Sequence, residues 1–225
     1  MKTARKMVMV MAMALAGASA LWAQMMGMRP PQIPGEFKPV VGSGSQYTMT
    51  TKKDSSSMDM AYAIVGKESV DGQDGYWMEI RMLSGKGGGM IMKQLMVIGG
   101  DQPGIKRMIM QMAGRPPMEM PMSMMSMMKN MPKAQESGQA SGKNHGMGEL
   151  VGTESVTVPA GTFECQHYRS QSDRGSADVW ITTKISPYGL VKMTSTDSTM
   201  VLAKVLSNET SQIKGEPQPM PGMPH

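Results

Sequence analysis

"MDMAYAIVGKESVDGQDGYWMEIRML", residues 58–83, contains two runs in which apolar residues alternate with polar or small ones. Met60, Tyr62 and Ile64 lie at every second position of the first run, and Met78 and Ile80 lie two positions apart in the second. Such alternation is typical of a strand with one buried face. A turn containing two glycines separates the runs, so the stretch predicts an antiparallel hairpin.

The same alternation recurs along most of the chain, with glycine-containing turns between several of the runs. We therefore expect a mainly β fold built on an antiparallel sheet of about ten strands. The runs that continue the pattern are "MIMKQLMVI" (90–98), "KRMIMQM" (106–112), "ESVTVPAGTFECQHYRS" (154–170), "SADVWITTK" (176–184) and "YGLVKMTSTDSTMVLAKVLSN" (188–208).

The first 23 residues have the pattern of a secretory signal peptide. Residues 1–6 carry three positive charges, and residues 7–18 form an uncharged apolar run that is followed by small residues. Cleavage is expected after Ala20 or after Ala23. The apolar run is too short to span a bilayer, which requires roughly 20 apolar residues. We expect an exported protein of the bacterial periplasm or cell envelope.

The segment "LAGA" within this peptide resembles the lipobox of bacterial lipoproteins. Ala18, however, occupies the position of the cysteine that such proteins acylate. The mature chain is therefore expected to be soluble, with neither a lipid anchor nor a transmembrane anchor.

Proline, glycine and small polar residues divide the rest of the chain. The expected organisation is a single antiparallel β domain over residues 36–214, with loosely ordered segments before, within and after it. These segments are a flexible lead-in (24–35), a mobile insertion (132–149) and a disordered tail rich in proline and methionine (215–225). Within the domain, methionines at helical spacing after Pro121 predict one short helix over residues 122–131.

Charge and cysteine content exclude several classes of function. The formal net charge of +5 falls to about +2 once the three charges of the signal peptide are removed, and no basic block interleaved with aromatics remains. Nucleic acid is therefore not an expected partner. Cys165, the single cysteine, cannot form an internal disulfide. Cys165 and His167 share a strand face but lack a third orienting group, so we expect no enzyme and no catalytic residues.

The stretch "GTESVTVPAGTFECQHYRS…ADVWITTKISPYGLVKMTS", residues 152–195, carries a family resemblance. The order of a valine-rich strand, "VPAGTF", a second strand, "VW" and a P-x-G-L-V-K segment resembles exported bacterial domains of the LolA/LppX-like half-barrel type. The resemblance covers about a quarter of the chain. It implies a strongly curved antiparallel half-barrel with an apolar concave side, and a lipid or lipoprotein as partner.

The chain contains 32 methionines, and eight of them fall within the fourteen residues 118–131. Three interpretations remain open: methionine as a general replacement for leucine in the core, a soft surface for an apolar ligand, or a site for Cu(I). Methionine is adaptable and polarizable, which suits the first two. Thioether sulfur is also a soft ligand that suits Cu(I).

The ligand-surface interpretation makes a specific prediction about faces. Alternation places methionines from four runs on one apolar side of the sheet. The predicted helix would form a lid over this side or the floor of its hollow. The predicted apolar ligand-binding residues are Met58, Met60, Tyr62, Met78, Met82, Met90, Met92, Met108, Met110, Met124 and Met128.

The copper interpretation is the alternative. It makes Cu(I) a cofactor, whereas the other interpretations require no cofactor. It needs several sulfurs that converge, preferably near a histidine. Its candidate metal ligands are Met118, Met120, Met122, Met125, Met220, Met223 and His225. A purely structural envelope protein is the third possibility, and the sequence leaves the oligomeric state open.

Overall fold

The computed structural model describes residues 35–83, 89–99, 104–121, 148–172 and 175–219, which all belong to the unit Ile33–His225. These residues form strands, turns and extended segments. No helix among them is long and apolar enough to cross a membrane. The predicted signal peptide, the predicted helix over 122–131 and almost all of the predicted insertion lie outside the described residues.

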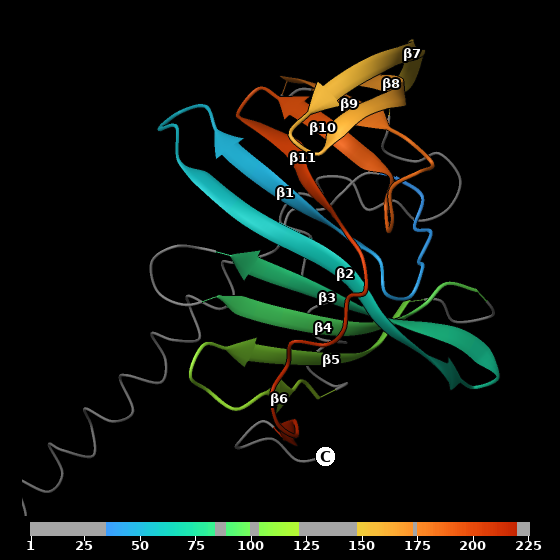
Figure 1. Ribbon diagram of the computed structural model, residues 1–225, viewed down its shortest axis with the longest axis vertical. Coiled ribbons are helices and arrows are strands. Elements are labelled where there is room, and N and C mark those ends of the chain that lie inside the picture. The colour runs from blue at the N-terminus through green and yellow to red at the C-terminus, as the bar shows by residue number, and fades with distance from the viewer. Residues whose placement is uncertain (1–34, 84–88, 100–103, 122–147, 173–174, 220–225) are drawn as a thin grey trace, which may run out of the picture. The chain divides into compact units, whose positions relative to one another are not determined.

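The described residues form twelve strands in one sheet (Figure 1). Its order is β12-β6-β5-β4-β3-β2-β1-β11-β10-β9-β8-β7, and the sheet does not close into a barrel. The strands are β1 (Gly44–Thr51), β2 (Ser57–Val70), β3 (Gln73–Leu83), β4 (Met90–Val97), β5 (Gly104–Met112), β6 (Met118–Glu119), β7 (Glu149–Val158), β8 (Gly161–Ser172), β9 (Gly175–Ile181), β10 (Leu190–Ser195), β11 (Ser198–Leu206) and β12 (Gln218–Pro219).

Two antiparallel meanders make up this sheet, as the Gly-containing turns predicted. Strands β1 to β6 form the first and β7 to β11 the second, and β1 pairs with β11 to join them. The β2–β3 turn illustrates why the residues of these turns suit their backbone conformation. Asp71 and Gly72 have φ values of 51° and 77°. Positive φ at both central residues is the requirement of a type I′ turn, for which Asp-Gly is a preferred pair.

The prediction of about ten strands was too low by two. The additional strands, β6 and β12, have two residues each and pair in parallel, Gln218 with Met118 and Pro219 with Glu119. Two residues cannot display a period of two, and the prolines around them argued against a strand. Pro219 is tolerated because, in the described sheet, β12 is an edge strand.

Strand register determines which side chains share a face. Directly opposed residues in antiparallel strands project to the same side, as do residues two apart on one strand. Met60 lies opposite Met82, Met82 opposite Met90 and Met90 opposite Met112. Followed across the sheet, this register puts all fourteen methionines of the described strands on one side. This methionine face comprises Met49, Met58, Met60, Met78, Met82, Met90, Met92, Met96, Met108, Met110, Met112, Met118, Met193 and Met200.

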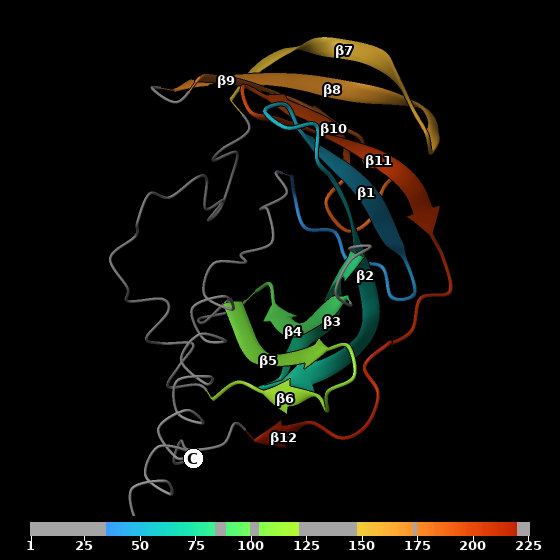
Figure 2. The same cartoon turned by 90° about the vertical axis from the view of Figure 1, so that its left-hand side faces the viewer.

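The segment after β11, residues 207–217, crosses the other side of the sheet, and we call it the strap. Figure 2 shows it running past β2–β6 on one side before it enters β12. On this strap face, Trp77, Leu95 and Ile109 form a core against which Ile213 of the strap packs. The tail was predicted to be disordered from residue 215 onward. The structure instead describes residues 215–219 and pairs the last two of them with β6, whereas residues 220–225 lie outside the described residues.

Buried charges attach the strap to the sheet. Glu79 and Arg81 are only 0% and 3% exposed. Arg81 donates to Glu79 at 3.0 Å, to the carbonyl of Thr210 at 2.9 Å, and to Glu209. Glu79 also accepts from Ser211 and from the backbone N–H of Gln212. No buried side-chain nitrogen or oxygen of the described residues lacks a hydrogen-bond partner.

Candidate functional site

The methionine face brings together every described residue of the predicted ligand surface. Four of these residues are half-buried: Met58, Met82, Met90 and Met108. The others are buried: Met60, Tyr62, Met78, Met92 and Met110. Met124 and Met128 lie outside the described residues.

Aromatic side chains cover the centre of this face, over β1–β3. Tyr188, from the loop before β10, meets the ring of Tyr62 edge-on at 6.1 Å and packs against Phe37 at 5.3 Å. Tyr47 of β1 also meets the ring of Tyr62 edge-on, at 6.0 Å. The protein's own side chains therefore cover the centre of this face, and half-buried methionines lie around it. Sequence reasoning missed Tyr47 and Tyr188, because isolated tyrosines in a strand and a loop give no periodic signal.

Three buried sulfurs on this face accept hydrogen bonds. The hydroxyl of Tyr188 donates to Sδ of Met78 at 3.5 Å, and that of Tyr62 donates to Sδ of Met60 at 3.5 Å. The amide Nε2 of Gln94 donates to Sδ of Met92 at 2.9 Å. Burial raises the pKa of Tyr188 to about 12, so its hydroxyl keeps the proton that it donates. These three methionines have structural roles in addition to any ligand contact.

Part of the predicted copper set also joins the methionine face. Met118 lies opposite Met110, and the N–H of Met120 donates to the carbonyl of Met108 at 2.9 Å. Met108 and Met110 on β5, Met118 on β6 and Met120 directly after β6 occupy neighbouring positions. The remaining candidates, Met122, Met125, Met220, Met223 and His225, lie outside the described residues. Within the described part, no group of three or more His, Cys, Asp or Glu residues could hold a metal ion.

The Cys165–His167 pair does not have the arrangement of an activated nucleophile. Cys165 is buried, and its thiol donates weakly to the carbonyl of Phe163. Burial, helped by the charges of Glu154 and Glu164, raises the pKa of Cys165 to about 11, so the reactive thiolate is disfavoured.

His167 is instead held by two carboxylates and an aromatic ring. Its Nε2 lies 2.7 Å from Asp178, its Nδ1 lies 3.0 Å from Glu154, and its ring stacks on Trp180 at 4.5 Å. Burial opposes ionisation of Asp178, but hydrogen bonds from His167 and Arg169 outweigh it and hold its pKa below the ordinary value. The cluster cross-links β7, β8 and β9.

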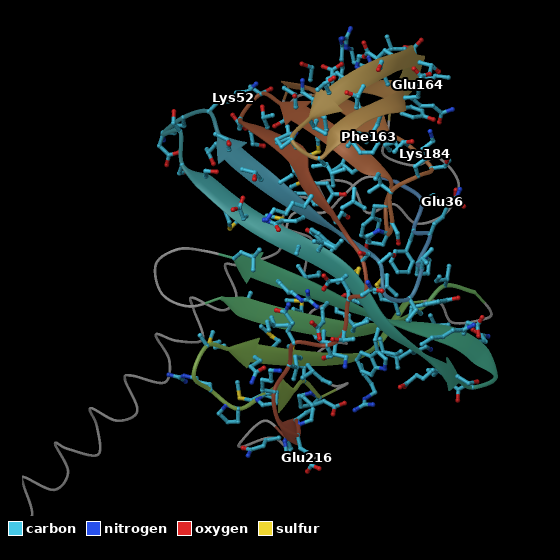
Figure 3. All side chains as sticks on the ribbon, in the orientation of Figure 1. Glu36, Lys52, Phe163, Glu164, Lys184 and Glu216 are labelled. Atoms are coloured by element: carbon cyan, nitrogen blue, oxygen red, sulfur yellow. The ribbon has the colours of Figure 1, made fainter. Side chains whose placement is uncertain are left out.

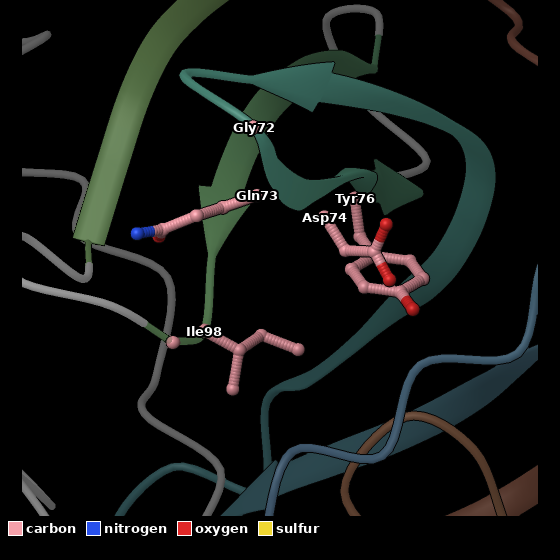
Figure 4. A pocket seen from close by; sticks show the side chains of 6 residues that line it. Gly72, Gln73, Asp74, Tyr76 and Ile98 are labelled. Atoms are coloured by element: carbon pink, nitrogen blue, oxygen red, sulfur yellow. The ribbon is translucent and has the colours of Figure 1, made fainter.

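Surface hollows in the described part of the chain include the following two. The first, of about 560 Å³, is lined by Gly72 of the β2–β3 turn, by the start of β3 and by Ile98 and Gly99 after β4 (Figure 4). Its carboxylate, Asp74, forms an ion pair with Lys67 at 2.8 Å. The second, of about 450 Å³, lies at the ends of β3, β4 and β5 beside the strap.

Comparison with known proteins gives two weak structural likenesses. A protein described as exported and as having a YmcC-like fold, from Bacteroides fragilis NCTC 9343, matches at 14% identity and a TM-score of 0.35, covering 77% of this chain and 99% of its own. A protein described as a lipoprotein, from Parabacteroides distasonis ATCC 8503, matches at 15% identity and a TM-score of 0.37, covering 77% and 100%. No protein-family model and no curated protein matches the chain. The LolA/LppX-like resemblance stays a prediction.

Proposed function

We propose that this chain is an exported, non-catalytic protein of the bacterial cell envelope that binds an apolar ligand on its methionine face. The ligand class is an acyl chain, carried by a lipid or by a lipoprotein. The proposed export follows from the signal-peptide pattern of the first 23 residues.

The main support for this proposal is the distribution of methionine between the two faces of the sheet. All fourteen methionines of the described strands share one face. The core of the strap face uses Trp77, Leu95 and Ile109 instead. If methionine merely replaced leucine in this protein, it would occur on both faces. A flexible, polarizable side chain confined to one face suits contact with partners of variable shape.

Accessibility supports the same function. Around the closed centre, Met58, Met82, Met90 and Met108 are half-buried and therefore retain surface for a ligand. Full burial of a methionine contributes roughly 1.5–3 kcal/mol, so a few such contacts supply useful affinity for an acyl chain.

The test is a titration with a fluorescent fatty acid, accompanied by native mass spectrometry of protein purified from its own envelope. We expect saturable uptake and a co-purifying lipid. The double variant Met108→Gln/Met118→Gln should bind at least about tenfold more weakly, because two apolar contacts are lost. The matched control Leu150→Gln/Val151→Gln alters two exposed apolar residues of β7 and should change affinity less than twofold. A mass equal to that of the protein alone, together with no uptake of the fluorescent fatty acid, would contradict the proposal.

Cu(I) binding is the second candidate, favoured by the adjacency of Met108, Met110, Met118 and Met120. The variant Met108→Leu/Met118→Leu separates the two functions, because leucine keeps the apolar surface but lacks the thioether. Acyl binding should persist in this variant. Tight Cu(I) binding that disappears in it, measured by competition with a chelator, would favour the copper function instead.

A further inference from the structure

The groove beside the strap has an apolar floor. Ile91 lies opposite Arg81 on β3 and opposite Gln111 on β5, and Leu83 is two residues beyond Arg81, so alternation directs Leu83 and Ile91 to the strap face. Leu83 is 44% exposed. The volume of about 450 Å³ lies within the range of small-molecule sites, roughly 300–1,000 Å³. The lining residues are Arg81, Met82, Leu83, Gly89, Met90, Ile91, Gln111, Met112, Ala113, Gly114, Arg115, Gln212 and Lys214.

Two cationic residues are held together at the rim of this groove. Arg115 closes a turn after β5, with its N–H donating to the carbonyl of Met112 at 3.0 Å and Gly114 at φ 72°. Gln111 then joins this turn to the strap. Its Nε2 donates to the carbonyls of Arg115 at 3.1 Å and Lys214 at 3.0 Å, and its Oε1 accepts from the N–H of Lys214 at 2.9 Å.

These two cations lack a counter-ion among the described residues. Arg115 and Lys214 are exposed, and neither takes part in an ion pair there, whereas Arg81 is already paired with Glu79 and Glu209. No aspartate or glutamate is among the described lining residues. Two neighbouring cations above an apolar floor are complementary to a molecule with an anionic head and an apolar tail.

We infer that this groove binds a single-chain fatty acid, with its carboxylate between Arg115 and Lys214 and its chain against Leu83 and Ile91. The inference goes beyond the proposed function, since Leu83, Ile91 and the two cations lie on the strap face, although Met82, Met90 and Met112 of the methionine face also line the groove.

Calorimetric titration with decanoate and with decanol tests this site. The wild-type chain should bind decanoate at least about tenfold more tightly than decanol, because only the acid supplies charge-assisted hydrogen bonds. The variant Arg115→Gln/Lys214→Gln should lose this preference and bind both compounds equally. The control Lys184→Gln/Lys204→Gln removes the same charge elsewhere and should keep the preference. In Figure 3, Lys184 lies far from Glu216, which is two residues after Lys214.

Other outcomes overturn the inference. Equal wild-type affinity for acid and alcohol, or a preference that survives Arg115→Gln/Lys214→Gln, would show that the cations do not bind the head group. In either case acyl binding itself would remain, and with it the function proposed for the methionine face. No binding of either compound would contradict both proposals. Denaturation midpoints of the two variants would establish that each remains folded.

Discussion

Replacing Arg81 with methionine is expected to lower the free energy of unfolding by roughly 3–5 kcal/mol, because it leaves the buried carboxylate of Glu79 without its cation. The substitution also removes the hydrogen bonds from Arg81 to Glu209 and Thr210, which hold the strap against β3. The loss should appear as a large shift of the midpoint in a denaturant titration. The double variant Glu79→Met/Arg81→Met should recover part of it, since the unpaired charge is then removed.

Arg107→Met is the matched control for this prediction. Arg107 lies on the same face, over the ring of Trp77 at 5.3 Å, and pairs with Glu119 at 2.7 Å, but it is exposed. Exposed pairs contribute about 0–1 kcal/mol. If Arg81→Met and Arg107→Met shifted the midpoint equally, the strap would not depend on the buried charge network.

Alkaline pH is expected to destabilise the protein through the tyrosines over the methionine face. Burial raises the pKa of Tyr188 from 10.0 to about 12, and it also raises the pKa values of Tyr47 and Tyr62. Above pH 10 the unfolded chain loses these protons while the folded chain keeps them. Their contribution to stability is therefore full below pH 10 and declines as pH rises through the folded-state values. Tyr188 alone accounts for a decline of about 2–3 kcal/mol near pH 12.

Unfolding free energy measured against pH, with tyrosinate absorbance followed in parallel, checks this expectation. Ionisation of Tyr47, Tyr62 and Tyr188 should coincide with loss of structure. Tyr188→Phe should make the alkaline decline shallower, because phenylalanine does not titrate. Ionisation of all tyrosines near pH 10 with the fold intact would contradict the account of a closed aromatic cover.

Alternation made the faces of the central strands predictable. Met60, Tyr62 and Ile64 recur at a strict period of two, and the register places them with Met78 and Met82, as expected. The turn between β2 and β3 was expected within residues 70–75, which contain two Asp-Gly pairs, and the structure forms it at Asp71–Gly72, where φ is positive at both positions. These signals are local, so a single sequence contains them.

The strap and the cationic groove were not predictable from the sequence. The strap is mostly polar, with the half-buried Ile213 packed against the core of the strap face, and shows no apolar period. Glu79 and Arg81 alternate with apolar residues, a pattern that indicates a solvent-facing side, yet both are buried beneath the strap. Arg115 and Lys214 are about a hundred residues apart in the chain, and Gln111 hydrogen-bonds to the backbone of both. Contacts of this kind depend on tertiary structure and leave no local pattern.

Methyl NMR of protein labelled at methionine and isoleucine, titrated with a spin-labelled long-chain alcohol, tests the methionine face most directly. A neutral ligand avoids attraction to the cationic groove. We expect selective broadening of the methyl signals of Met58 and Met108, which do not line the groove, while the signals of Ile91 in the groove and of Ile109 beneath the strap stay sharp. Uniform signals, or broadening confined to isoleucines of the strap face, would contradict this expectation.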